Sequence, residues 1–274
     1  MIRDITIGQY YPVSSPIHHM DARVKLMITF LFILTLFFVN TFTGYVFVVL
    51  CMAAVIKTSK VPLKFMLRGI KGILIIILFT AFINVFMTRG EHILLEWGVF
   101  TVTTEGIFMA IKMCVRIILL VIGSSILTLT TTPIQLTDGI EYLLRPLKKI
   151  GVPAHEIAMM MTIALRFIPT LLDETDKIMK AQQARGADFD SGNLLQRAKS
   201  LIPILVPLFI SAFRRADELA MAMEARCYHG DENRTRMNVM VLKPSDYKAI
   251  MMLTLYCMVL ILLRFAASQF SFIL

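Results

Sequence analysis

The sequence has little charge and lacks the paired cysteines of several protein classes. Only 17% of its 274 residues are charged, whereas soluble domains contain about 25%. The four cysteines, Cys51, Cys114, Cys227 and Cys257, form no Cys-x-x-Cys pair, which argues against a disulfide framework or a zinc site. Hydrophobic residues make up 57% of the chain. This composition predicts an integral membrane protein.

A phosphate-binding loop is also missing. No Gly-Lys-Ser or Gly-Lys-Thr occurs, so the chain lacks the usual nucleotide site of an ATPase. The net charge of +9 does not indicate nucleic acid binding, because the basic excess lies in short loops between apolar runs. We therefore expect no nucleic acid partner, and no catalytic residue, cofactor site or metal site in this chain.

Long apolar runs predict five membrane-spanning helices. Residues 26–56 are almost continuously apolar. As one helix they would be about 46 Å long, too long for a bilayer core of about 30 Å. The break at residues 40–44 therefore predicts two spans joined by a tight turn. The other spans are expected at about 69–87, 106–131 and 249–267.

Basic residues lie at the ends of these spans and within the fourth. Arg23, Lys25 and Lys57 are expected to extend toward the polar interface. Lys112 and Arg116 share a helix face, and interfacial anchoring or contact with a neighbouring helix is favoured over an ion pathway. No span contains Asp or Glu. Ion-coupled carriers and intramembrane metalloenzymes generally need such groups at membrane depth, so this class is disfavoured.

The loop charges predict an orientation. Residues 57–71 contain five lysines or arginines and no acid, whereas residues 89–105 contain one arginine and three glutamates. The positive-inside rule places residues 57–71 in the cytoplasm. With five spans, the N-terminus is then cytoplasmic and the C-terminus lies outside.

The charged residues concentrate between the fourth and fifth spans. We expect a membrane region at 1–131 with four helices, a cytoplasmic region at 132–248, and a last membrane helix at 249–274. The middle region holds 30 of the 47 charged residues. It contains a short amphipathic element at 133–153 and two long amphipathic helices, whose apolar positions follow helical spacing. The fold class is therefore all-α, with about five spans and about three amphipathic helices.

The apolar face of the first long helix comprises Ile157, Met161, Ala164, Leu165, Ile168, Leu171, Leu172, Ile178 and Met179. That of the second comprises Leu201, Leu205, Leu208, Phe209, Ala212, Ala216, Leu219, Ala220 and Met223. The two helices also resemble each other at an offset of 41 residues. Asp176, Ala181, Ala184 and Arg185 match Asp217, Ala222, Ala225 and Arg226.

Both long helices end in Ala-Arg followed by a third residue. The first tip is Ala184, Arg185 and Gly186, and the second is Ala225, Arg226 and Cys227. An arginine in a last turn complements the helix dipole, and glycine suits the left-handed cap. Two such tips also favour docking, because small neighbours let the guanidinium enter a groove and grip carboxylates. Cys227 in place of glycine leaves open a second helix that continues toward Gly230.

These paired tips resemble the coupling helices of the transmembrane T component (EcfT/CbiQ-like family) of energy-coupling factor (ECF) transporters, which belong to the ABC type. The N-terminal segment is similar too. Its matching positions are Gly8, Tyr10, Ser15, His18, Asp21, Arg23 and Lys25, with Ala22 where a proline is usual.

The resemblance implies a non-catalytic scaffold in a bacterial or archaeal cell membrane. It would link two cytoplasmic ATP-binding subunits to a membrane-embedded substrate-capture (S) component for the uptake of vitamins or metal ions. Arg185 and Arg226 would each enter a groove of one ATPase, and ATP would be bound by those partners rather than by this chain. ATP-driven closure of the ATPases would change the spacing of the two tips.

Three alternatives are weighed against this interpretation. A permease of an ordinary ABC importer also docks on ATPases, but one short coupling loop is expected there rather than two long helices. The acidic run Asp-Glu-Thr-Asp at 173–176 suggests a solvated helix face more than a metal site. His18 and His19 suggest a polar turn beside the membrane, since no further histidine or cysteine has ligand spacing.

Overall fold

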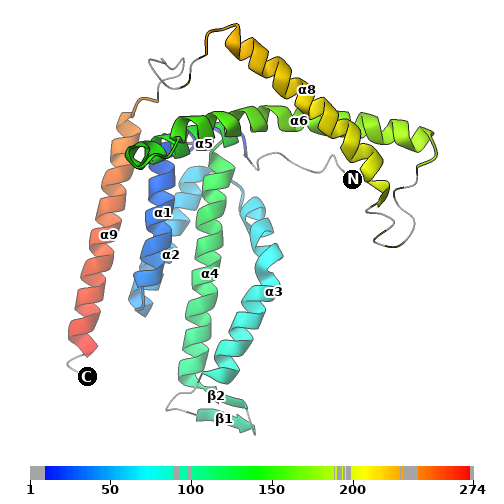
Figure 1. Cartoon of the computed structure of the whole chain (residues 1–274). Coiled ribbons are helices and arrows are strands. Elements are labelled where there is room, and N and C mark those ends of the chain that lie inside the picture. Colours follow the sequence, from blue (N-terminus) through cyan, green and yellow to red (C-terminus); the bar gives the residue numbers. More distant parts are fainter. Residues whose placement is uncertain are drawn as a thin grey trace. The chain divides into compact units, whose positions relative to one another are not determined.

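The computed structural model describes residues 10–88, 93–97, 100–187, 189, 193, 195, 199–228, 230 and 240–271. Helices dominate this part of the chain, as predicted (Figure 1). Five of them are α1 (Ala22–Phe38), α2 (Phe42–Ser59), α3 (Leu63–Met87), α4 (Thr104–Thr130) and α9 (Pro244–Ser271). The others are α5 (Pro133–Leu144), the 3₁₀ helix η2 (Arg145–Ile150), α6 (Ala154–Ala184) and α8 (Ile202–Glu224).

The described residues group into two compact units. One contains the described residues of 8–139 and 240–274, and the other contains those of 140–239. The first unit includes α1 to α4 and α9, and the second includes η2, α6 and α8. Helix α5 begins in the first unit and ends in the second.

Five described helices are long and apolar enough to cross a membrane: α2, the Gly69–Met87 part of α3, α4, α6 and the Pro244–Ala266 part of α9. Helix α6 was predicted to be amphipathic rather than membrane-spanning, and it has the lowest mean hydropathy of the five. Helix α1 has 17 residues, or about 26 Å, slightly less than the bilayer core. The predicted break between the first two spans is confirmed, because α1 ends at Phe38 and α2 begins at Phe42.

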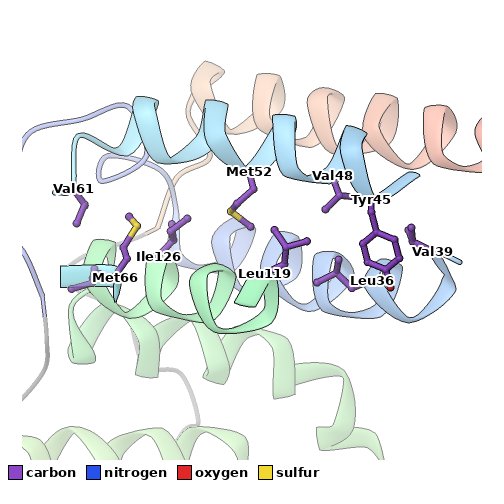
Figure 2. Packing of buried hydrophobic residues seen from close by; sticks show 10 residues of the cluster. Leu36, Val39, Tyr45, Val48, Met52, Val61, Met66, Leu119 and Ile126 are labelled. Atoms are coloured by element: carbon purple, nitrogen blue, oxygen red, sulfur yellow. The ribbon is translucent and has the colours of Figure 1, made fainter. Parts of the chain in front are cut away.

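Helix α4 lies at the centre of the first unit. It contacts α1, α2 and α3, while α9 contacts α1 and α2. Figure 2 shows the buried apolar cluster between these helices, where Leu36, Val48 and Met52 face Leu119 and Ile126. A Cβ atom at Gly123 would lie 2.7 Å from a ring carbon of Phe32, so α4 approaches α1 at a distance that only glycine allows without rearrangement.

Two features of the first unit were not anticipated. Strands β1 (Ile93–Trp97) and β2 (Phe100–Thr103) form an antiparallel hairpin between α3 and α4. The expectation that Arg23 and Lys25 extend to the interface is wrong. Arg23 is 9% exposed and Lys25 is 5% exposed, because both donate hydrogen bonds inside the unit.

Candidate functional site: two arginine-tipped helices

The first tip closes α6 with a complete Schellman motif. Gly186 has a φ of +88°. Its N–H donates to the Gln183 carbonyl over 2.9 Å, and the Ala187 N–H donates to the Gln182 carbonyl over 3.0 Å. These two bonds satisfy carbonyls that the helix end leaves open, and they need a left-handed residue after Arg185. The sequence pattern therefore fixes where α6 stops.

The second tip has the same hydrogen-bond pattern. The Cys227 N–H donates to the Glu224 carbonyl over 2.9 Å, and the Tyr228 N–H donates to the Met223 carbonyl over 3.1 Å. Cys227 occupies the left-handed position with a φ of +55°. A second helix that continues toward Gly230 is therefore wrong, because α8 ends at Glu224 and the chain turns at Cys227.

Both tips are open to solvent. All six tip residues are exposed: Ala184, Arg185, Gly186, Ala225, Arg226 and Cys227. Neither guanidinium has a hydrogen-bonding or ion-pair partner among the residues that the structure describes. Each arginine is thus presented beside small residues that place no bulk around the charge.

A polar cluster joins the two helices between their tips. Arg215 on α8 contacts Glu174 on α6 with 2.5 Å between Nη2 and Oε2. The Ser211 hydroxyl, one turn earlier on α8, donates to the other oxygen of the same carboxylate. This contradicts a fully solvated face for the acidic run, since Glu174 packs against α8 while Asp173 is exposed. Across the chain that the structure describes, no group of three or more His, Cys, Asp or Glu is placed to hold a metal ion.

The sequence contained an unused signal for this contact. Glu174 lies three residues after Leu171 and four before Ile178, and Arg215 lies between Ala212 and Leu219 in the same way. Opposite charges at apolar-stripe positions indicate a pair between helices rather than two solvated side chains. Helical periodicity alone did not identify the partner of each.

An apolar groove of about 260 Å³ lies beside this cluster. From α6 it is lined by Ile163, Phe167 and Leu171, and from α8 by Ala212, Arg215, Ala216, Leu219, Ala220 and Met223. At the other end of the contact, the Gln182 amide approaches the Pro203 carbonyl at 3.4 Å. The helices therefore run antiparallel where they cross, and their two tips lie at opposite ends of the pair (Figure 1).

The fold defines a multi-pass helical membrane protein in which two paired helices each end in an exposed arginine. The family model described as "CbiQ: Cobalt transport protein" matches residues 13–237. An energy-coupling factor transporter transmembrane protein EcfT of Ruminiclostridium cellulolyticum is 62% identical over 237 residues, which cover 86% of this chain and 88% of the relative. That of Clostridium kluyveri is 60% identical over 250 residues, with coverage of 91% and 93%. That of Bacillus subtilis is 46% identical over 264 residues, with coverage of 96% and 100%.

The chain belongs to this family. It is the transmembrane component of an ECF transporter, a transporter subunit rather than an enzyme. The alternatives weighed from the sequence, an ordinary ABC permease and an ion-coupled carrier or metalloenzyme, are therefore wrong.

Proposed function

We propose that this chain couples two cytoplasmic ATP-binding subunits to a membrane-embedded substrate-capture subunit, with Arg185 and Arg226 as the two docking residues. The observation that carries the proposal is the duplicated tip. Two helices end in the same hydrogen-bonded motif and present the same exposed arginine beside small residues. Arginine is suited to this task because its planar group donates two parallel hydrogen bonds to a carboxylate.

Placing the tips at opposite ends of one antiparallel pair supports two docking events rather than one. Helix α8 has 23 residues, so its ends are about 35 Å apart. Two ATPases would each receive one tip, and ATP-driven closure would change the distance between their grooves. Because Glu174 and Arg215 join the helices, such a change would act on the crossing of α6 and α8 as a whole.

In this proposal residues 132–248 form the coupling region on the cytoplasmic side, with membrane regions at 1–131 and 249–274. The N-terminus is cytoplasmic and the C-terminus is outside, in a bacterial cell membrane; the five basic residues of 57–71 support this orientation. ATP is bound by the partner subunits. The cargo is a vitamin or a metal ion delivered by the capture subunit.

The decisive experiment compares Arg185→Ala, Arg226→Ala and the double variant. Each is expressed with the ATPases and purified in mild detergent. Mass spectrometry then identifies the captured chains, and those whose sequences contain a phosphate-binding loop are counted as ATPases. Loss of one buried charge pair costs about 2–5 kcal/mol of binding. We therefore expect weakened capture in each single variant and none in the double variant, with little rescue by lysine.

Arg166→Ala is the matched control, because Arg166 is an exposed arginine within α6, away from its tip. It should leave capture and ATP hydrolysis unchanged. If the double variant captures the ATPases as well as the unaltered chain, both arginines are ordinary helix ends and the proposal is wrong.

A further inference from the structure

The coupling region is continuous with the first unit at two places, which we call its two roots. The first root follows α4, where the chain passes from Thr130 into α5 at Pro133. The second root precedes α9, where Met240 to Lys243 lead into the helix at Pro244. Both roots belong to the first unit, and both contact the first turn of α1.

Lys25 holds the first root. Its ammonium group donates to the Thr130 carbonyl over 2.8 Å and to the His18 carbonyl over 3.2 Å. One residue earlier on α4, the Leu129 carbonyl accepts the Tyr11 N–H over 2.9 Å. The Leu129 and Thr130 carbonyls lie at the end of α4, where no further turn of helix satisfies them. A cation is therefore well placed there.

Arg23 and Asp246 hold the second root. Arg23 Nη2 donates to the Met240 carbonyl over 2.9 Å. The Asp246 carboxylate accepts the Asp21 N–H over 3.0 Å and the Lys243 N–H over 2.8 Å. Asp246 is fully buried, so these two bonds help to offset the cost of burying its charge.

The charges of this cluster balance. Asp21 accepts from Arg23 at 3.0 Å through Nε and at 2.7 Å through Nη2, and it also caps α1 through the Arg23 N–H. Two buried cations thus lie among two buried anions. Burying four charges is costly, and replacing buried ion pairs by apolar residues of similar volume is often neutral or stabilising. A network of this kind instead specifies one arrangement of the groups that it joins, which here are α1 and the two roots.

We propose that Asp21, Arg23, Lys25 and Asp246, the root cluster, form a positioning joint that ties both roots of the coupling region to the first turn of α1. A displacement of the coupling helices is then passed to α1 and α9 instead of being absorbed by fraying at the roots. This inference rests on the proposed function, because it presumes that ATPases move the coupling helices.

The test uses the full complex with its ATPases in lipid nanodiscs. Lys25→Met removes the charge and both carbonyl contacts at similar length. Arg23→Lys keeps the charge but loses the two-pronged contact with Asp21. Lys57→Met is the control, because Lys57 is an exposed lysine at the end of α2. Hydrogen–deuterium exchange is measured with and without ATP and vanadate, together with ATP hydrolysis.

In the unaltered complex we expect ATP to change exchange in α6 and α8 and also in the first turns of α1 and α9. In Lys25→Met the change in α6 and α8 should persist, along with ATP hydrolysis, while the change in α1 and α9 is lost. Basal exchange near Thr130 should rise about tenfold through loss of the root contacts. Arg23→Lys should show the same loss for α9, and Lys57→Met should match the unaltered chain.

An ATP-induced change in α1 and α9 that survives in both cluster variants would overturn the joint while leaving the docking proposal intact. If neither variant assembles as a folded complex, the cluster acts in folding and the positioning role is wrong. If the unaltered chain captures no ATPase, the docking proposal fails, and the joint fails with it.

Discussion

The guanidinium of Arg116 on α4 donates from Nε to the Tyr45 hydroxyl on α2 over 2.9 Å. Its Nη2 also donates to the Val39 carbonyl at the end of α1 over 3.2 Å. One charged group in the middle of α4 therefore joins this helix to the end of α1 and to the first turn of α2. Contact with a neighbouring helix, favoured over an ion pathway from the sequence, is confirmed for Arg116.

Replacing Arg116 with Met should lower the free energy of unfolding by about 1.5–3 kcal/mol, because two polar groups lose a charged donor. Tyr45→Phe should cost less, since the Val39 contact survives. Thermal unfolding in detergent would measure both. Lys112→Met, one turn earlier on α4, is the control and should change little. Equal stability of Arg116→Met and the unaltered chain would contradict the assigned contact.

Replacing Glu174 with Gln should weaken the packing of α6 on α8 by about 1–2 kcal/mol, because the contact with Arg215 loses its charge. Their side chains are only 22% and 29% exposed, so solvent screens the pair weakly. A double-mutant cycle with Arg215→Gln, read by thermal unfolding, should show a coupling above about 0.5 kcal/mol. Asp173→Asn, on an exposed neighbour, is the control. Additive effects of the two changes would mean that the pair is not formed.

Acidification should destabilise the N-terminal segment through His18. Its Nε2–H donates to the Tyr11 carbonyl over 3.0 Å, so Nδ1 accepts the Ser15 hydroxyl over 2.7 Å in the neutral ring. Burial lowers the pKa of His18, and the charge of Lys25 adds to this effect while the Tyr11 carbonyl opposes it. The folded protein therefore binds fewer protons than the unfolded chain below the ordinary pKa of about 6.5.

The stability from neutral His18 is thus present above that pH and is lost as the pH falls through the lowered value. Thermal unfolding between pH 7.5 and pH 4.5 should show a smaller acid-induced loss in His18→Gln than in the unaltered chain. The exposed His19 provides the control variant His19→Gln. If His19→Gln removes the pH dependence and His18→Gln does not, the assignment is wrong.

The two tips should respond in opposite ways to changes at their left-handed positions. Gly186→Ala introduces a Cβ at a φ of +88° and should cost about 1 kcal/mol of local stability. Cys227→Gly removes a Cβ at a φ of +55° and should stabilise the second tip by up to about 1 kcal/mol. Hydrogen exchange of the Ala187 and Tyr228 amides would report each effect. A loss of protection in both variants would contradict equivalent caps.

The orientation is tested with reporter fusions. A reporter active outside the cell should work after Leu274, and one active in the cytoplasm should work when inserted near Asn193. Both follow from the basic loop at 57–71 and five spans. A cytoplasmic C-terminus would show that the number of spans is wrong, and the 26–56 region would be the first place to recount.

Much of the fold follows from the sequence, because apolar length and turn residues act locally. The break at 40–44, the last spans and the end of α6 at its glycine cap follow in this way, whereas the end of α8 does not, because Cys227 stands at the left-handed position where glycine is usual. The burial of Arg23 and Lys25 was not, because their partners at Met240 and Thr130 are more than 100 residues away. Basic residues beside an apolar run usually extend to the interface, and only the fold brings acceptor carbonyls to them. The hairpin at 93–103 was missed because a short two-stranded element gives a weak periodic signal.

The pair of Glu174 and Arg215 also carries a symmetry. These residues are separated by 41 positions, the same offset that relates Arg185 to Arg226. When two corresponding residues of an antiparallel repeat contact each other, an approximate two-fold axis passes between them. The two tips are then related by a half-turn about the α6–α8 crossing. If two ATPases dock as proposed and are related by a two-fold axis, their two grooves are also related by a half-turn. A single copy of this chain would then fit one tip into each groove.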